Sequence, residues 1–205
     1  SNIMLNELDK ELEKRGLKFV RYADDCIIMV KSEKAANRVM ESIVKFIEKK
    51  LGLKVNATKS KVDRPRGIKY LGYGFYKNKS GVWKPKPHLK SIQKFERKLK
   101  QLTKRSWSIS LDSRIKMLNY VIRGWINYFR IADMKTAMNR ITQHLNRKIR
   151  CIIWKQWKTC KHRMKCLQVL GVDKDNTKEG AYSRKSYWRS SKSIIIHKAI
   201  SNDRL

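Results

Sequence analysis

The chain has 205 residues, of which 50 are Lys or Arg and 17 are Asp or Glu, so its formal net charge is +33. Residues 1–60 carry 13 basic and 9 acidic side chains, and residues 61–205 carry 37 and 8. Self-repulsion of this size destabilises a compact chain without an anionic partner, which argues against an ordinary domain for neutral ligands. Nucleic acid is favoured over an anionic membrane surface or another acidic partner.

No apolar run approaches the roughly 18 residues of a transmembrane helix, and no secretory signal is visible at the start, so we expect no membrane association. The four cysteines form no obvious disulfide framework, and a reducing intracellular compartment is therefore expected. Cys151, Cys160, His162 and Cys166 do not follow the paired C-x₂₋₄-C spacing of structural zinc sites. Free thiols are expected there instead of zinc.

The first elements in chain order are a helix and a hairpin. Apolar residues recur on one helical face over residues 2–15. Two short apolar runs, 18–23 and 26–30, follow it and read as antiparallel strands. This pattern predicts a β-hairpin with Asp24 and Asp25 at its turn.

The next elements are a second helix and a second hairpin. Ser32 is a plausible N-cap for an amphipathic helix that ends before Gly52. A basic loop comes next, and the apolar segments 68–76 and 82–87 then flank the turn sequence KNKSG. They predict a hairpin with a glycine-bearing turn.

From residue 88 the pattern changes to long helices. Apolar stripes at helical spacing cover residues 92–102, 115–129 and 134–152, with a cap at Ser110 or Asp112 before the second and Asp133 before the third. Basic residues lie on the other side of each stripe, which predicts a three-helix bundle with a cationic exterior. The tail from about residue 160 is basic and rich in serine, and its pattern gives no assignment.

The adjacent carboxylates of Asp24 and Asp25 lie between apolar strands, where each disfavours ionisation of the other. A hairpin turn lets both project from the same end of a sheet. Together they can hold Mg²⁺, which prefers oxygen ligands, and two metals about 4 Å apart can activate a hydroxyl and stabilise a leaving pyrophosphate. An Asp-Asp pair alone is also typical of a solvated turn.

Six segments resemble those of reverse transcriptases of the group II intron maturase family. "YADD" between apolar strands resembles the catalytic motif, and "SNIMLNELDKEL" and "LGLKVNATKSKV" resemble palm segments before and after it. "IKYLGYGF" is similar to the primer-grip hairpin. "NYVIRGWINYFR" and "IRCIIWKQWK" resemble the maturase, or X, domain that follows the palm.

The resemblance implies a role for several residues. Asp24 and Asp25 match the metal-binding aspartates of a two-metal Mg²⁺ site, and Tyr22 and Ala23 match positions near the primer end and the incoming nucleotide. Lys59 matches a lysine proposed to protonate pyrophosphate, although it also reads as one more exposed lysine. The residues that match the primer grip are Leu71, Gly72, Tyr73 and Gly74. Glycine at 72 and 74 fits either a close approach of a sugar-phosphate backbone or a strand bulge.

Polymerase chemistry in this family needs a further aspartate from an earlier palm motif, and none of the acidic residues before Asp24 follows an apolar strand. The resemblance therefore implies the C-terminal portion of a larger nucleotidyltransferase, whose metal site residues outside the chain would complete. We expect this fragment alone to be inactive as a polymerase.

The helical part supplies candidate contacts to nucleic acid. Lys and Arg bind phosphates, and aromatic side chains stack on unpaired bases. Trp125, Trp154 and Trp157 lie on or beside apolar stripes, so core packing is favoured for them, whereas Trp188 lies in a polar segment. The candidates are Lys100, Lys104, Arg105, Arg140, Arg147, Lys148, Arg150, Lys155, Lys158 and Trp188.

The sequence thus predicts an α+β fold: a partial reverse-transcriptase palm over residues 1–87, a helical thumb or X domain over 88–160, and a basic maturase segment over 161–205. The expected function is part of an RNA-directed DNA polymerase that also binds intron RNA and assists splicing and mobility. Group II intron RNA, a template–primer duplex and a DNA target are the expected partners, in an intracellular setting such as the bacterial cytoplasm. The alternative is a non-catalytic RNA-binding or chaperone module of a ribonucleoprotein.

Overall fold

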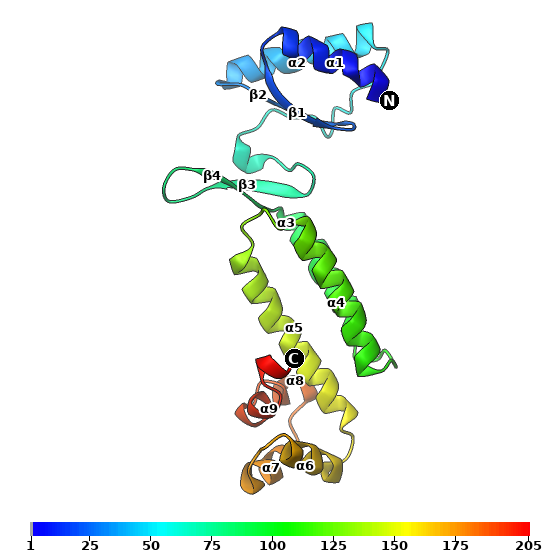
Figure 1. The fold of residues 1–205 in the computed structure, drawn as a ribbon, viewed down its shortest axis with the longest axis vertical. Coiled ribbons are helices and arrows are strands. Elements are labelled where there is room, and N and C mark those ends of the chain that lie inside the picture. The colour runs from blue at the N-terminus through cyan, green and yellow to red at the C-terminus, as the bar shows by residue number, and fades with distance from the viewer. Residues whose placement is uncertain (1) are drawn as a thin grey trace. The chain divides into compact units, whose positions relative to one another are not determined.

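The computed structural model describes residues 2–205. The chain forms two compact units, one that ends at His88 and one that begins at Leu89. The first is a mixture of helices and two-stranded sheets, and the second is helical (Figure 1). The predicted α+β fold is confirmed.

The first unit begins with α1 (Asn2–Lys14), β1 (Lys18–Tyr22), β2 (Asp25–Met29) and α2 (Glu33–Lys50). The two strands are antiparallel, with Lys18 opposite Met29 and Tyr22 opposite Asp25. Strand alternation turns one face of the hairpin toward the helices and leaves the other exposed. The core between them contains Leu5, Leu8 and Leu12 of α1 and Ile43 of α2, with Phe19, Cys26 and Ile28 of the strands packed against it.

The predicted second helix is confirmed together with its cap. The hydroxyl of Ser32 accepts a hydrogen bond from the backbone N–H of Ala35 at 3.2 Å, which satisfies one of the free donors at the start of α2. Gly52 follows the helix with φ +62°, the left-handed conformation that ends many helices.

The second hairpin is also present, but its first strand is shorter than predicted. It consists of β3 (Tyr73–Lys77) and β4 (Trp83–Pro87), preceded by the 3₁₀ turn η1 (Pro65–Gly67). Leu71 and Gly72 have φ values of +47° and +81°, and they form a tight turn between Tyr70 and Tyr73, whose backbones exchange hydrogen bonds of 3.0 and 2.8 Å. This turn interrupts the apolar run, so the strand cannot start before Tyr73.

The second unit is built on α3 (Leu89–Leu102), α4 (Leu111–Tyr128) and α5 (Lys135–Gln156). The three predicted stripes meet in one core, which confirms the three-helix arrangement. Ser110, one of the two predicted caps of α4, accepts a hydrogen bond from the N–H of Ser113. The N-cap residue of α5 is Met134, which makes no side-chain capping hydrogen bond. The buried members are Phe95, Leu99, Leu102, Leu118, Ile141 and Ile149.

The tail that the sequence left unassigned folds into α6 (Cys160–Val169), α7 (Lys174–Ala181), α8 (Tyr187–Ser190), α9 (Ile194–Ala199) and the 3₁₀ turn η2 (Asn202–Arg204). These short elements gather around the C-terminal half of α5 (Figure 1). A second core forms there. Its buried members are Trp154, Leu167, Ile196, Ala199 and Ile200.

Two arginines depart from the predicted cationic exterior. Arg114 of α4 is 1% exposed and Arg150 of α5 is 3% exposed. The guanidinium of Arg114 donates to the backbone oxygens of Leu102 and Trp107, which fixes the loop between α3 and α4. A buried arginine is tolerated where backbone carbonyls accept its hydrogen bonds.

None of the helices in the described part of the chain is both long enough and apolar enough to cross a membrane.

Candidate functional site

The YADD segment forms the tip of the first hairpin. Ala23 and Asp24 are the two turn residues and Asp25 is the first residue of β2, so the turn lies one position earlier than predicted. Tyr22, Ala23, Asp24 and Asp25 are all exposed. Ala23 has φ +50°, a left-handed conformation that costs a non-glycine residue on the order of 1 kcal/mol.

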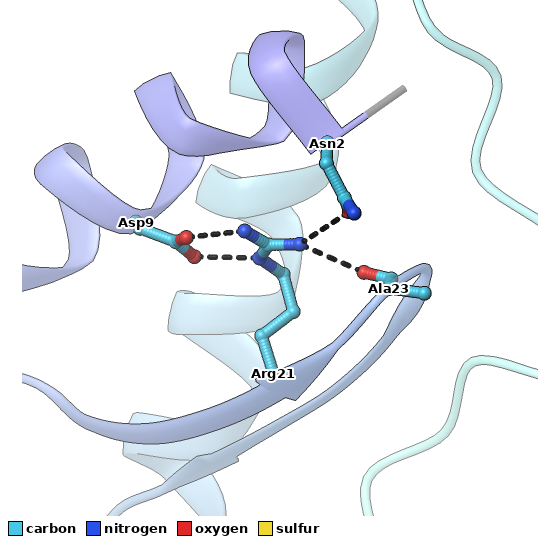
Figure 2. A network of polar contacts seen from close by, with 4 residues as sticks. All are labelled: Asn2, Asp9, Arg21 and Ala23. Carbon is cyan, nitrogen blue, oxygen red and sulfur yellow. Dashed lines mark hydrogen bonds and ion pairs between the residues drawn. The ribbon is translucent and has the colours of Figure 1, made fainter.

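Arg21 holds this tip against α1 (Figure 2). Its Nε donates to Oδ1 of Asp9 at 2.7 Å and its Nη2 donates to Oδ2, so the pair is bidentate. Its Nη1 donates to the backbone oxygen of Ala23 at 2.9 Å and to Oδ1 of Asn2 at 3.3 Å. The hydrogen bonds from Arg21 hold the pKa of the Asp9 carboxyl below its usual value.

The Arg21–Asp9 pair was not among the residues singled out from the sequence. Arg21 occupies a strand position between apolar neighbours, and Asp9 lies on the polar side of α1. A charged residue between apolar neighbours of a strand is the signal that could have found Arg21, because such a group needs a partner. Nothing local to the strand identifies Asp9 as that partner.

Tyr70 is a second residue that sequence reasoning missed. Its hydroxyl is buried and lacks a hydrogen-bond partner within residues 2–205. Burial raises the pKa of Tyr70, and the charge of Asp25 at the start of β2 raises it further. Burial also raises the pKa of the Cys26 thiol to about 11, so this cysteine stays protonated at neutral pH.

The predicted primer-grip residues occupy the tight turn and the start of β3. The backbone N–H of His88 donates to the oxygen of Gly72 at 2.9 Å, which ties the turn to the end of β4. A Cβ on Gly74 would lie 3.5 Å or more from His88, an ordinary contact. Packing within the chain therefore does not require glycine at 74, whereas the positive φ of Gly72 does favour glycine.

Lys59 lies in an exposed turn whose backbone is organised by Asn56. The side-chain oxygen of Asn56 accepts from the N–H groups of Thr58 and Lys59 at 3.1 and 3.2 Å. Within the described chain, the Lys59 ammonium makes no hydrogen bond or ion pair with Asp24 or Asp25.

The hairpin tip fits part of a magnesium site. Carboxylate oxygens are the ligands that Mg²⁺ prefers, and those of Asp24 and Asp25 are exposed and make no hydrogen bond within residues 2–205. No group of three or more His, Cys, Asp or Glu side chains that could hold a metal exists within those residues. A magnesium ion held by Asp24 and Asp25 would therefore need further ligands.

Five of the predicted cationic residues of the second unit, with Trp188 and His144, lie around α5 and α8. The Arg147 guanidinium lies 3.8 Å from the centre of the Trp188 ring, and its Nη2 donates to the Trp188 backbone oxygen at 3.1 Å. The His144 ring meets the same indole edge-on at 5.7 Å. We call this group the α5–α8 surface: Lys100, Arg105, His144, Arg147, Lys148, Lys155 and Trp188.

Several contacts show that these side chains are neighbours. Burial lowers the pKa of Lys148, and the charge of Lys100 on α3 lowers it further. Arg105 donates weakly to the sulfur of Cys151 at 3.8 Å, and the Lys155 ammonium donates to the Arg105 backbone oxygen at 2.9 Å. Cations gathered at one place on the surface favour an anionic partner.

The remaining candidates lie elsewhere, and one of them is a correction. Arg150 is buried; its Nε donates to the Ile200 oxygen at 2.7 Å and its Nη2 to Oδ1 of Asn202 at 2.6 Å, so it is not available for a phosphate. Arg140 is exposed but pairs with Glu96 at 2.8 Å. Lys104 and Lys158 are exposed in the loops that follow α3 and α5.

The tryptophans favoured for packing are in the interior or next to it. Trp154 is 1% exposed, and Trp125 stacks on Phe95 with ring centres 4.5 Å apart. Cys166 and His162 approach to 3.5 Å on α6.

Comparison with protein families agrees with the resemblance. The family described as reverse transcriptase (RNA-dependent DNA polymerase) matches residues 1–75, and that described as group II intron, maturase-specific domain, matches residues 92–171. No curated protein matches the sequence significantly. The first match contains the YADD hairpin, and the second contains α4, α5 and α6. The chain thus belongs to the group II intron reverse transcriptase/maturase family, with the C-terminal part of a reverse transcriptase domain followed by a maturase-specific domain.

Proposed function

We propose that the chain binds group II intron RNA through the α5–α8 surface and assists splicing and mobility, and that its hairpin tip serves DNA synthesis within a larger polymerase. The observation that carries the RNA-binding proposal is the Arg147–Trp188 stack. One face of the indole holds a guanidinium, and the side chain is still 37% exposed. An unpaired base can stack on such a ring while the neighbouring cations bind its phosphates.

The maturase-specific domain implies intron RNA as the partner. Residues 61–205 carry 37 basic side chains against 8 acidic ones, so this part of the chain has a large excess of phosphate-binding groups. A template–primer duplex and a DNA target would use the same kind of contacts, because phosphates are common to all three.

In DNA synthesis, Asp24 and Asp25 would hold Mg²⁺, which supplies charge stabilisation to the reacting phosphates. Tyr22 and Ala23 would flank the nucleotide at the same tip, and Lys59 would protonate the departing pyrophosphate. The primer strand would be held by Leu71, Gly72, Tyr73 and Gly74. Arg21 keeps the tip in place through Asp9. Within residues 2–205 these two aspartates belong to no larger group of metal ligands, and we expect this chain alone to be inactive in synthesis.

The proposed domain organisation is a partial palm over residues 1–87, a thumb or X domain over 88–160 and a basic maturase segment over 161–205. The rival proposal is a non-catalytic RNA chaperone in which the Asp pair is a structural turn. The two proposals differ in whether Asp24 matters for DNA synthesis by a polypeptide that also carries the earlier palm aspartate.

RNA binding is tested with the double variant Arg147→Gln/Lys148→Gln. Loss of two cations beside Trp188 should weaken binding to an in vitro transcribed group II intron RNA about tenfold at 100 mM salt. The charge-matched control is Lys116→Gln/Arg123→Gln, two exposed residues of α4. Filter binding of both variants and the parent chain measures the difference; equal losses in the two variants would refute the α5–α8 surface.

The synthesis proposal is tested by primer extension on an RNA template with Mg²⁺. The 205-residue chain should extend nothing, and extension should appear when a palm segment that carries the earlier aspartate is joined to it in one polypeptide. In that longer protein, Asp24→Asn should abolish extension and leave RNA binding intact. Robust extension by the short chain, or normal extension by Asp24→Asn, would contradict the assignment.

A further inference from the structure

A cavity that is partly open to solvent lies among α7, α8 and α9, in the segment beyond the matched maturase domain. Its volume is about 660 Å³, a size typical of small-molecule sites. Its lining comes from residues 179–196, whereas the maturase-specific match ends at residue 171. Neither the α5–α8 surface nor the hairpin tip contributes to it.

The charged groups of this cavity are mainly cations without protein partners. Arg184, Lys185 and Arg189 line it, and none of their side chains forms a hydrogen bond or ion pair within the described part of the chain. Glu179 is the one acidic side chain in the lining. Three unpaired cations around a hollow favour an anionic ligand, and two guanidinium groups can each bind a phosphate bidentately.

Serine hydroxyls provide further donors. Ser186 and Ser193 accept backbone N–H groups at the starts of α8 and α9, from Arg189 and Ile196 at 3.4 Å each. A hydroxyl that accepts such a bond still has its own proton to donate, and Ser183 is in the same position with respect to Lys185. These protons are free for oxygens of a ligand.

The cavity also has an apolar side. Ile195 and Ile196 line it, and Ile196 is buried in the second core, which fixes that wall. A ligand that combines phosphate oxygens with an apolar, flat portion matches both sides. Inorganic phosphate would leave the isoleucines without a contact.

We propose that this cavity binds a single nucleotide, with its phosphate on Arg184, Lys185 and Arg189 and its base or sugar against Ile195. The nucleotide is one displaced from an RNA or DNA strand, or a free one, since the three share this chemistry. The site lies apart from the Arg147–Trp188 stack, so it extends the RNA-binding proposal without depending on that stack.

The test uses the ¹⁵N-labelled 205-residue chain with adenosine 5′-monophosphate as the probe. Amide resonances of residues 183–196 should shift on titration, and adenosine without phosphate should bind at least tenfold more weakly. Arg184→Gln/Arg189→Gln should weaken nucleotide binding at least tenfold, whereas Arg184→Lys/Arg189→Lys should restore part of it. Absence of saturable shifts at millimolar nucleotide, or equal binding of adenosine, would overturn the proposal.

The charge-matched control is Lys192→Gln/Lys198→Gln, two exposed lysines of the same segment outside the cavity. It should change nucleotide affinity by less than twofold; a loss as large as that of the arginine variant would show general attraction only and refute the site. Arg147→Gln/Lys148→Gln should bind the nucleotide normally, which separates this proposal from the α5–α8 surface. Single-stranded RNA and DNA oligonucleotides of one sequence, compared on the arginine variant, then identify the strand that supplies the nucleotide.

Discussion

At the scale of single residues, the hairpin tip depends on a contact made far from the motif. Ala23 is held in a left-handed conformation while the guanidinium of Arg21 binds its carbonyl oxygen and Asp9. A bidentate arginine–carboxylate pair fixes orientation as well as position. The location of Asp24 and Asp25 at a hairpin end was predictable from alternating apolar residues, but the partner of Arg21 was not, because Asp9 lies 12 positions away in another element.

Asp9→Asn should lower the free energy of local opening of the hairpin by about 1–2 kcal/mol at pH 6, because it removes the charged acceptor of two hydrogen bonds. The native pKa of Asp9 is lowered, so this contribution is present above the carboxyl's unfolded pKa of roughly 4 and is lost as pH falls through the native value. Hydrogen exchange of the β1–β2 amides should be faster in the variant at pH 6, with the difference gone at pH 2.

The control for this effect is Glu7→Gln, which removes the exposed partner of Lys10 on the same helix. It should leave exchange in the hairpin unchanged. A difference between Asp9→Asn and the parent that stays constant down to pH 2 would mean that the Asp9 charge does not stabilise the tip.

At the scale of elements, α5 contributes both to the α5–α8 surface and to the protein interior. Arg147 and Arg150 are three positions apart and equally cationic in sequence, yet Arg147 stacks on Trp188 and Arg150 is covered by the segment around Ile200. The apolar stripe of α5 predicted the helix correctly. Which arginine would be covered could not be predicted, because the covering segment comes 50 residues later and consists of short capped turns without a long stripe.

Arg150→Leu should destabilise residues 89–205 by about 2–4 kcal/mol, because it leaves the buried oxygen of Ile200 without its donor. Chemical denaturation followed by tryptophan fluorescence measures this loss. Arg140→Leu, which removes an exposed ion pair with Glu96, should change the free energy of unfolding by less than about 1 kcal/mol. Similar stability of the two variants would show that the Arg150 contacts are dispensable.

At the scale of the whole molecule, charge was the most informative property of the sequence. The excess of basic over acidic side chains is concentrated after residue 60, and composition alone indicated a nucleic-acid partner. Period-2 and period-3.6 patterns predicted both hairpins and the three long helices. The helices of the tail were not predicted, because helices of four to ten residues depend mainly on their caps and on packing against Trp154.

RNA binding should be strongly salt-dependent. If about six or more phosphates are neutralised, affinity should fall by roughly three decades between 50 and 200 mM salt. A series of filter-binding titrations with the intron RNA at fixed pH gives the slope of log affinity against log salt. A nearly flat slope would exclude phosphate contacts as the main source of affinity.

The continuity of α5 has a mechanical consequence. Its residues enter the three-helix core through Ile149 and the second core through Trp154, and Ile153 packs against both. Local unfolding of either core therefore disorders part of α5, which also packs in the other core. Unfolding of one core should thus reduce the stability of the other. Loss of order in one half of α5 should therefore lower the stability of both cores together.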